Sequence, residues 1–163
     1  MLTREEILEL VYYDKNSGEI FWKANSGAAT LGRKCGWTRP DGYRQVYIKK
    51  HPLLLHRVIW LLEKGEWPSK LIDHINGNKS DNRISNLRLA NHEQNGRNSK
   101  LHIKNKSGER NVFWRDGHQK WEVSVRVNKK TIYLGWFKDY ELACLVAQEA
   151  RGKFHKEYAT NRK

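Results

Sequence analysis

The hydrophobic positions of the first hundred residues predict two amphipathic helices. Thr3 and Glu6 form a capping box, which predicts a short helix over residues 4–12. Leucine, isoleucine and valine recur at helical spacing through residues 53–64, and the pattern stops at Gly65. This spacing predicts a second helix with one buried face.

Short strands are expected around these helices. Residues 19–23 and 43–49 have strand composition and follow turn signals. Residues 70–75 and 84–89 predict two further strands joined by a polar loop, with a helix to follow over 90–99. Three asparagines share one face of that helix, at Asn91, Asn95 and Asn98.

The last third of the chain has the two-residue period of a half-buried strand. Apolar and polar residues alternate over 121–127, and a turn at 128–130 leads to a second strand over 131–137. Residues 111–115 supply a third strand. One apolar stripe runs on from Asp139, which is suited to be the N-cap, and predicts a helix behind the sheet.

Together these patterns predict an α+β fold with two modules. The first domain would cover residues 1–98. A polar, basic linker at 99–109 would join it to a three-stranded antiparallel sheet packed on one helix, over 110–163.

Charge favours a polyanionic partner. The net charge is +13, and both parts of the chain are basic: residues 1–100 hold 17 Lys/Arg against 11 Asp/Glu, and 101–163 hold 14 against 7. Nucleic acid fits better than a membrane, because the chain has no long apolar run and no basic amphipathic helix. A basic protein without such a partner is the alternative.

Cysteine usage and the N-terminus predict a cytoplasmic protein. Cys35 and Cys144 have neither zinc-finger nor CxxC spacing, so a structural zinc site is not expected and a reducing compartment fits. The first residues lack the apolar core of a signal peptide, and no segment approaches the length of a membrane span.

The segment 73–95 carries the side chains best suited to chemistry. Hydrolysis of a phosphodiester needs a base for the water proton and positive charge near the phosphorus oxygens. His74 can be the base, because imidazole titrates near neutral pH. Asp73 and Asn95 offer hard oxygen ligands, which suit one Mg²⁺ or Mn²⁺ better than zinc. Asn86 could fix the loop and the orientation of the histidine.

This constellation resembles the ββα-metal motif of HNH endonucleases, particularly the phage and homing-type members. The blocks LLLHRVIW, DHINGNKSDNR and NLR carry the resemblance, which covers roughly residues 1–98. It implies that His74 is the general base, that Asn86 is the catalytic-site asparagine orienting it, and that Asp73 and Asn95 bind the metal. Asn95 stands where the family name has histidine, as in the homing-type branch.

The resemblance implies a phage or mobile-element protein that cuts double-stranded DNA, by nicking or by double-strand cleavage. It would act in the host bacterial cytoplasm with one Mg²⁺ or Mn²⁺ per active site, as a monomer or a homodimer. The alternatives are a non-catalytic DNA-binding protein that keeps the HNH scaffold, and a structural or RNA-directed role.

Several residues near the motif have a plainer interpretation. The Asp73–Asn78 segment alone could be a capped turn. His56, in an apolar helix, is better explained as a hydrogen-bonded structural histidine, and His92 falls on a different helix face from Asn95. Three arginines are candidates for phosphate contacts and equally for solvated charges or ion pairs: Arg57, Arg83 and Arg88.

Residues 110–158 resemble the plant ethylene-response-factor, or APETALA-type, DNA-binding domain. The blocks RNVFWRDG, KWEVSVRV, YLGWF and LACLVAQEARGKFH carry this resemblance. It implies a sheet that enters the DNA major groove on the face opposite the valines of residues 121–127, where Glu122 and Ser124 also project. The residues at DNA-contacting positions are Arg110, Arg115, Arg126 and Tyr133.

Phe113 stands where that family has arginine, so the plant target sequence is not carried over. The alternative for this module is that its arginines are only solubilising charge and that its tryptophans are ordinary core. Those tryptophans are Trp114, Trp121 and Trp136.

Overall fold

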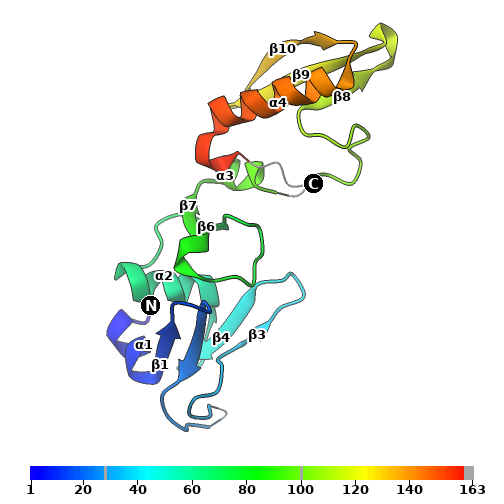
Figure 1. Cartoon of the computed structure of the whole chain (residues 1–163). Coiled ribbons are helices and arrows are strands. Elements are labelled where there is room, and N and C mark those ends of the chain that lie inside the picture. The colour runs from blue at the N-terminus through cyan, green and yellow to red at the C-terminus, as the bar shows by residue number, and fades with distance from the viewer. Residues whose placement is uncertain (28, 100, 160–163) are drawn as a thin grey trace. The chain divides into compact units, whose positions relative to one another are not determined.

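The computed structural model describes residues 1–27, 29–99 and 101–159 (Figure 1). The chain forms two compact units, Met1–His92 and Glu93–Lys163. Each unit mixes helices and strands and has its own hydrophobic core, so the α+β prediction is confirmed.

The first unit opens with the predicted capped helix, α1 (Arg4–Leu10). The Thr3 hydroxyl accepts from the Glu6 amide at 3.2 Å, and the Glu6 carboxylate accepts from the Thr3 amide at 2.9 Å. The helix ends two residues earlier than predicted. Val11–Asp14 form strand β1 instead, because they pair antiparallel with β2 (Glu19–Trp22).

A second antiparallel sheet follows, with strand order β3-β4-β5. Its strands are β3 (Trp37–Thr38), β4 (Arg44–Ile48) and β5 (His51–Leu54). The sequence pattern missed β5. The turn before it places Lys49 and Lys50 in the left-handed region, at φ 47° and 64°, and two lysines give no sequence signal for such a turn.

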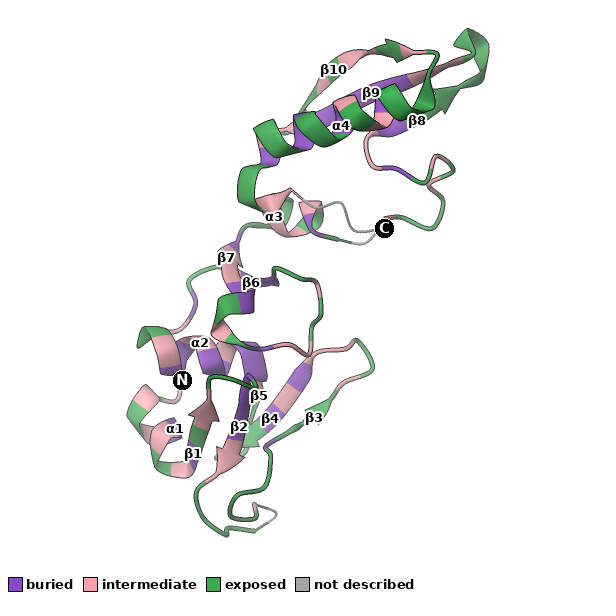
Figure 2. Ribbon diagram, in the orientation of Figure 1, coloured by how far each residue is buried: buried purple, intermediate pink, exposed green. Residues whose placement is uncertain are grey.

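Helix α2 (Leu55–Lys64) supplies much of the core of the first unit (Figure 2). It ends at Gly65, which is left-handed at φ 81°, as the sequence predicted. Its buried apolar side chains pack with Ile7, Val11 and Ile20. They are Leu55, Val58, Ile59, Leu61 and Leu62.

The first unit ends in a β-hairpin. Strand β6 (Leu71–His74) pairs antiparallel with β7 (Leu87–Ala90). The first residues of the predicted strand 84–89 form a 3₁₀ turn instead, η1 (Ile84–Asn86). Helix α3 (His92–Arg97) comes next and continues into the second unit, so Asn91 and Asn98 lie outside the helix.

The second unit is a three-stranded antiparallel sheet of order β10-β9-β8, with one long helix packed on it (Figure 1). Asp139 caps the helix, because its carboxylate accepts from the Leu142 amide at 2.6 Å. Val112, Val123 and two helix alanines form the core. The elements are β8 (Val112–Arg115), η2 (Asp116–His118), β9 (Lys120–Val127), β10 (Lys130–Phe137), α4 (Tyr140–His155) and η3 (Lys156–Tyr158).

The segment predicted as a linker is attached to the second unit. The Tyr140 hydroxyl donates to the Ser107 carbonyl at 2.5 Å. The Arg151 guanidinium pairs with the Glu109 carboxylate at 2.7 Å, and both side chains are buried. Residues 107 and 109 are therefore bound to α4, and this segment is part of the second unit.

In the described part of the chain, no helix is long and apolar enough to cross a membrane. Cys35 and Cys144 are both free thiols.

Candidate functional site

The β6–β7 hairpin holds the Asp73-His74 pair. Asp73 lies opposite Arg88 and His74 lies opposite Leu87. Adjacent strand residues point to opposite faces, so the two side chains are directed apart. Both are buried, at 5% exposure for Asp73 and 3% for His74.

The ring of His74 is held by an asparagine that sequence reasoning missed. Nε2 of His74 lies 3.1 Å from Oδ1 of Asn82, a residue with no exposed surface. The amide group of Asn82 donates in turn to the Ser80 carbonyl at 3.3 Å, which fixes its orientation. An amide oxygen only accepts, so Nε2 of His74 carries the hydrogen and the lone pair of the neutral ring is on Nδ1.

Aromatic rings surround His74. The Tyr43 ring is 5.9 Å and the His56 ring 5.2 Å from it, and those two rings are 5.3 Å apart. Burial lowers the pKa of His74 below its ordinary value, and the hydrogen bond to Asn82 opposes that shift in part. Burial lowers the pKa of His56 to about 3. Both imidazoles are therefore neutral at neutral pH.

His56 is an interior residue, as expected from its place in an apolar helix. The expected hydrogen bonding is not complete. Nδ1 of His56 is buried without a hydrogen-bond partner among the residues that the structure describes.

Asn86 clamps the loop between the two strands. Its side-chain oxygen accepts from the Asn76 amide at 2.9 Å. Its amide group donates to the Asn76 side chain at 3.0 Å and to the Asp81 carbonyl at 2.8 Å. Asn86 thus acts on the loop, while Asn82 bonds the His74 ring.

The loop carries its own ion pair. The Arg83 guanidinium donates to both carboxylate oxygens of Asp81, at 2.8 and 2.6 Å. These bonds lower the pKa of Asp81 to about 2. Half of the Arg83 side chain remains exposed, so it still offers charge to solvent.

The N-terminal hairpin braces this loop. The Tyr13 hydroxyl accepts from the Ile84 amide at 3.2 Å. Gly18, left-handed at φ 72°, lies so close that an added Cβ would be 2.4 Å from the Arg83 nitrogen. No side chain fits there without displacing the loop backbone.

Asp73, the predicted metal ligand, is paired in this structure with Arg88, which was a candidate for a DNA contact. The guanidinium nitrogens of Arg88 lie 2.8 and 2.7 Å from one carboxylate oxygen. The two side chains are only 6% and 13% exposed, and such buried charges are stable only when paired.

Carboxylate and amide oxygens are the kind of ligand that a hard cation takes. In the described ranges, no three His, Cys, Asp or Glu side chains are arranged to hold a metal ion. Mg²⁺ needs no such cage, because one or two carboxylates with waters and substrate phosphates commonly hold it. Asp73 lies in the first unit and Asn95 lies on α3 in the second, and their shared role stays a prediction.

Three of the predicted DNA-contacting residues, Arg115, Arg126 and Tyr133, share one sheet face by strand register, whereas Arg110 precedes the first strand of the sheet. Arg126 and Tyr133 are exposed, Tyr133 at 71%. Arg115 pairs with Glu122, at 2.9 and 3.2 Å. Glu122 and Ser124, which were expected to project on this face, are buried.

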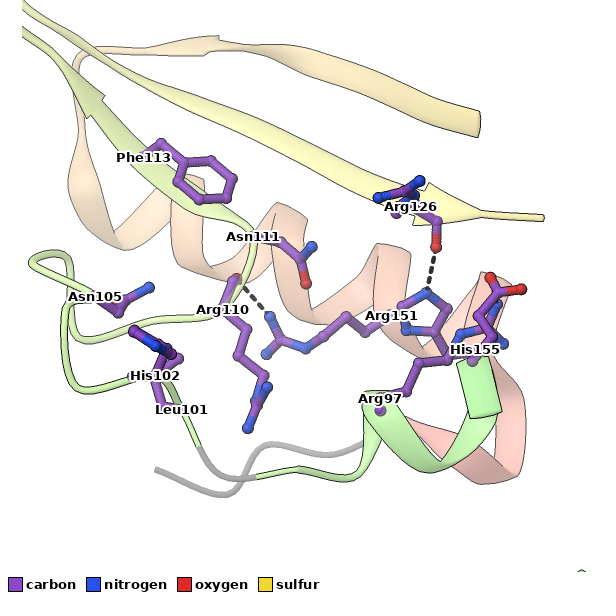
Figure 3. Close-up of a pocket in the computed structure, with 12 residues that line it drawn as sticks. Arg97, Leu101, His102, Asn105, Arg110, Asn111, Phe113, Arg126, Arg151 and His155 are labelled. Carbon is purple, nitrogen blue, oxygen red and sulfur yellow. Dashed lines mark hydrogen bonds and ion pairs between the residues drawn. The ribbon is translucent and has the colours of Figure 1, made fainter. Parts of the chain in front are cut away.

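A basic pocket of about 400 Å³ adjoins this face (Figure 3). Arg151 donates to the Arg110 carbonyl at 2.8 Å, and the His155 ring lies 3.1 Å from the Arg126 carbonyl. Among the described residues that line the pocket, Glu93 is the one with an acidic side chain. It pairs with Arg97 at 2.7 Å. Arg151 is likewise paired, with Glu109, so two of the arginines that line the pocket are already neutralised by carboxylates. Its basic lining residues are Arg97, His102, Arg110, Arg126, Arg151 and His155.

Comparison with known proteins places this site in a family. Residues 53–97 match the HNH endonuclease family. The chain is also 34% identical to Protein 3.8 of Escherichia phage T7 over 89 residues, which are 54% of this chain and 71% of that protein. No solved structure matches the chain.

Proposed function

The chain belongs to the same family as Protein 3.8 of Escherichia phage T7 and contains an HNH endonuclease domain, and on this premise we propose that it is a metal-dependent endonuclease that hydrolyses phosphodiester bonds of double-stranded DNA. The observation that carries the proposal is the ring of His74, neutral and fixed by Asn82, inside the matched region.

His74 is the general base of the proposed reaction. Nδ1 carries the lone pair and takes the proton of the attacking water, which makes the ring an imidazolium. The Asn82 oxygen accepts from Nε2 throughout, at 3.1 Å. It therefore holds the tautomer and stabilises the charged ring, as the orienting partner of a catalytic histidine does elsewhere.

Asp73 and Asn95 are the proposed ligands of one Mg²⁺ or Mn²⁺. When bound, such an ion stabilises the charge that develops on the phosphate and leaving-group oxygens. Arg88 neutralises Asp73 in the absence of the ion, so we propose that metal binding competes with this ion pair.

The second unit is the proposed DNA reader, in line with its resemblance to the APETALA-type domain. Arg110, Arg115, Arg126 and Tyr133 would contact bases or phosphates. Arginine can make a bidentate contact with guanine, whereas a phosphate contact carries no sequence information. Arg83, whose side chain is half exposed, would add a contact near the cut, and Arg88 could add one only after leaving Asp73. One such active site cuts one strand, so a double-strand break would take a homodimer or two successive cuts.

The test is conversion of supercoiled plasmid to nicked circle in Mg²⁺. We expect cutting by the full chain, loss of cutting in EDTA, and loss in His74→Ala. His51→Ala is a matched control, because His51 is an exposed histidine on β5 of the same unit. Equal cutting by His74→Ala and His51→Ala would refute the mechanism.

One observation favours a second candidate, a non-catalytic DNA-binding protein. The buried Asp73–Arg88 pair already satisfies the carboxylate that a metal would need. This candidate predicts duplex binding that is the same with and without Mg²⁺, and no cutting with any divalent ion.

A further inference from the structure

A large groove lies in the first unit beside β3 and β4, away from the His74 ring. Its volume is about 1020 Å³, at the upper end of the range for ligand sites. Aromatic and basic side chains line it, and the described lining residues include no acid. Those that bear on its chemistry are Trp37, Tyr47, Arg33, Lys34, Lys49 and Lys50.

The two aromatic rings form an open stacking platform. Trp37 and Tyr47 lie 5.4 Å apart with their planes 19° from parallel. They are 44% and 53% exposed, and neither belongs to the core of the unit. Large aromatic side chains left in water in this way mark a binding surface rather than a packing need.

The turn beside the platform holds two cations in a conformation that does not favour lysine. Lys49 and Lys50 are both left-handed, at φ 47° and 64°. Asn-Gly is the usual choice for such a turn, because it adopts positive φ with little strain. Lys49 pairs with Glu6 at 2.9 Å, and Lys50 is exposed. The turn therefore accepts backbone strain at two lysines and places positive charge at the mouth of the groove.

We propose that this groove binds an unpaired segment of DNA, with bases stacked on Trp37 and Tyr47 and phosphates at Arg33 and Lys50. In a duplex the neighbouring base pairs cover both faces of every base. Only an unpaired strand can present those faces to aromatic rings, and basic side chains then hold its backbone.

This inference rests on the proposed function only in taking DNA as the ligand. Beyond the duplex that is cut, it adds single-stranded DNA as a ligand. The protein should then prefer duplexes with an adjoining unpaired stretch.

The test is binding of a fluorescent oligothymidylate of about 15 nucleotides to the full chain in EDTA, followed by anisotropy. We expect Trp37→Ala with Tyr47→Ala to weaken binding about tenfold or more. Lys50→Gln should weaken it less and flatten its salt dependence. Because no metal is present, the result does not depend on whether the protein cuts.

Tyr12→Ala is the matched control for the aromatic variants. Tyr12 is 44% exposed, like Trp37, and stacks on Phe21 at 5.1 Å, but neither residue lines the groove. We expect Tyr12→Ala to bind as the parent does, and thermal melting establishes that each variant is folded.

Three results would overturn the proposal. The folded double variant and Lys50→Gln could both bind as tightly as the parent. Tyr12→Ala could weaken binding as much as the double variant. Unlabelled duplex or single-stranded RNA could displace the oligonucleotide better than unlabelled single-stranded DNA does.

Discussion

At the scale of single residues, the proposed chemistry depends on which nitrogen of His74 carries the proton. Asn82 determines this, because its side-chain oxygen faces Nε2 while its amide group is occupied by the Ser80 carbonyl. The general base can act only while the ring is neutral, and burial favours the neutral form. The pH dependence of cutting therefore reports on the burial of the ring and on its hydrogen bond to Asn82.

Asn82→Asp should move the acid limb of the cutting rate to higher pH. A carboxylate in place of the amide stabilises the imidazolium and raises the pKa of His74, so a higher pH is needed to free the base. The measurement is kcat/KM for nicking against pH. Asn78→Asp is the control, since Asn78 is an exposed asparagine of the same loop, and an equal shift in both variants would contradict the assignment.

Arg88→Ala tests whether Asp73 can hold a metal. Without metal, removal of one partner leaves a buried carboxylate unpaired and should cost about 3–5 kcal/mol of unfolding free energy. If Asp73 is a ligand, Mg²⁺ should recover much of that loss and stabilise the variant more than the parent. Thermal melting with and without Mg²⁺ checks this, and equal shifts in the two proteins would count against Asp73 as a ligand.

His56 should make the first unit sensitive to acid. Its pKa falls from 6.5 when unfolded to about 3 when folded, so the unfolded chain binds the proton more readily. The stability is fully present above pH 6.5 and is lost as the pH falls toward 3, by about 3 kcal/mol between pH 7 and pH 4.

His56→Phe removes this proton-binding group and should flatten the pH dependence of unfolding. Denaturant titrations at pH 7 and pH 4 compare the two proteins. A parent and variant that lose the same stability over this interval would contradict the argument.

At the scale of secondary structure, the sequence predicted elements whose ends are set by local contacts. Thr3, Gly65 and Asp139 each mark a helix end through bonds within a few residues. Strands β1, β3 and β5 were missed, because their structure depends on a partner strand and not on their own composition.

The candidate site was likewise predictable only where a local sequence pattern marks its residues. The order of Asp73, His74 and Asn86 along the chain carries a spacing that can be recognised in the sequence. Asn82 carries none, since it is one of several asparagines in a polar loop and only folding reveals which one reaches the ring. The Asp73–Arg88 pair likewise depends on strand register.

The turn between β4 and β5 offers a prediction at this scale. Lys49→Asn with Lys50→Gly should relieve the left-handed strain and raise the unfolding free energy by about 1 kcal/mol or more. The same change should weaken binding of the oligothymidylate, because charge is lost at the groove. A variant that gains stability and keeps full affinity for the oligothymidylate would show that the two lysines do not contribute to binding.

At the scale of the whole molecule, each unit has its own core and can be tested alone. If the second unit reads DNA, Glu93–Lys163 should bind duplex with an affinity that falls steeply with salt. Met1–His92 should lose affinity and sequence preference relative to the full chain. Gel-shift titrations at two salt concentrations measure both, and a first unit that binds as tightly and selectively as the full chain would assign the reading to that unit.

The close approach of Gly18 to the loop backbone has a genetic consequence. A screen of random mutants for lost cutting should return Gly18 together with His74, although glycine contributes no reactive atom and lies far from the histidine in the sequence. Even the gain of a single methyl group there should inactivate the protein, whereas the neighbouring Ser17 should tolerate many replacements.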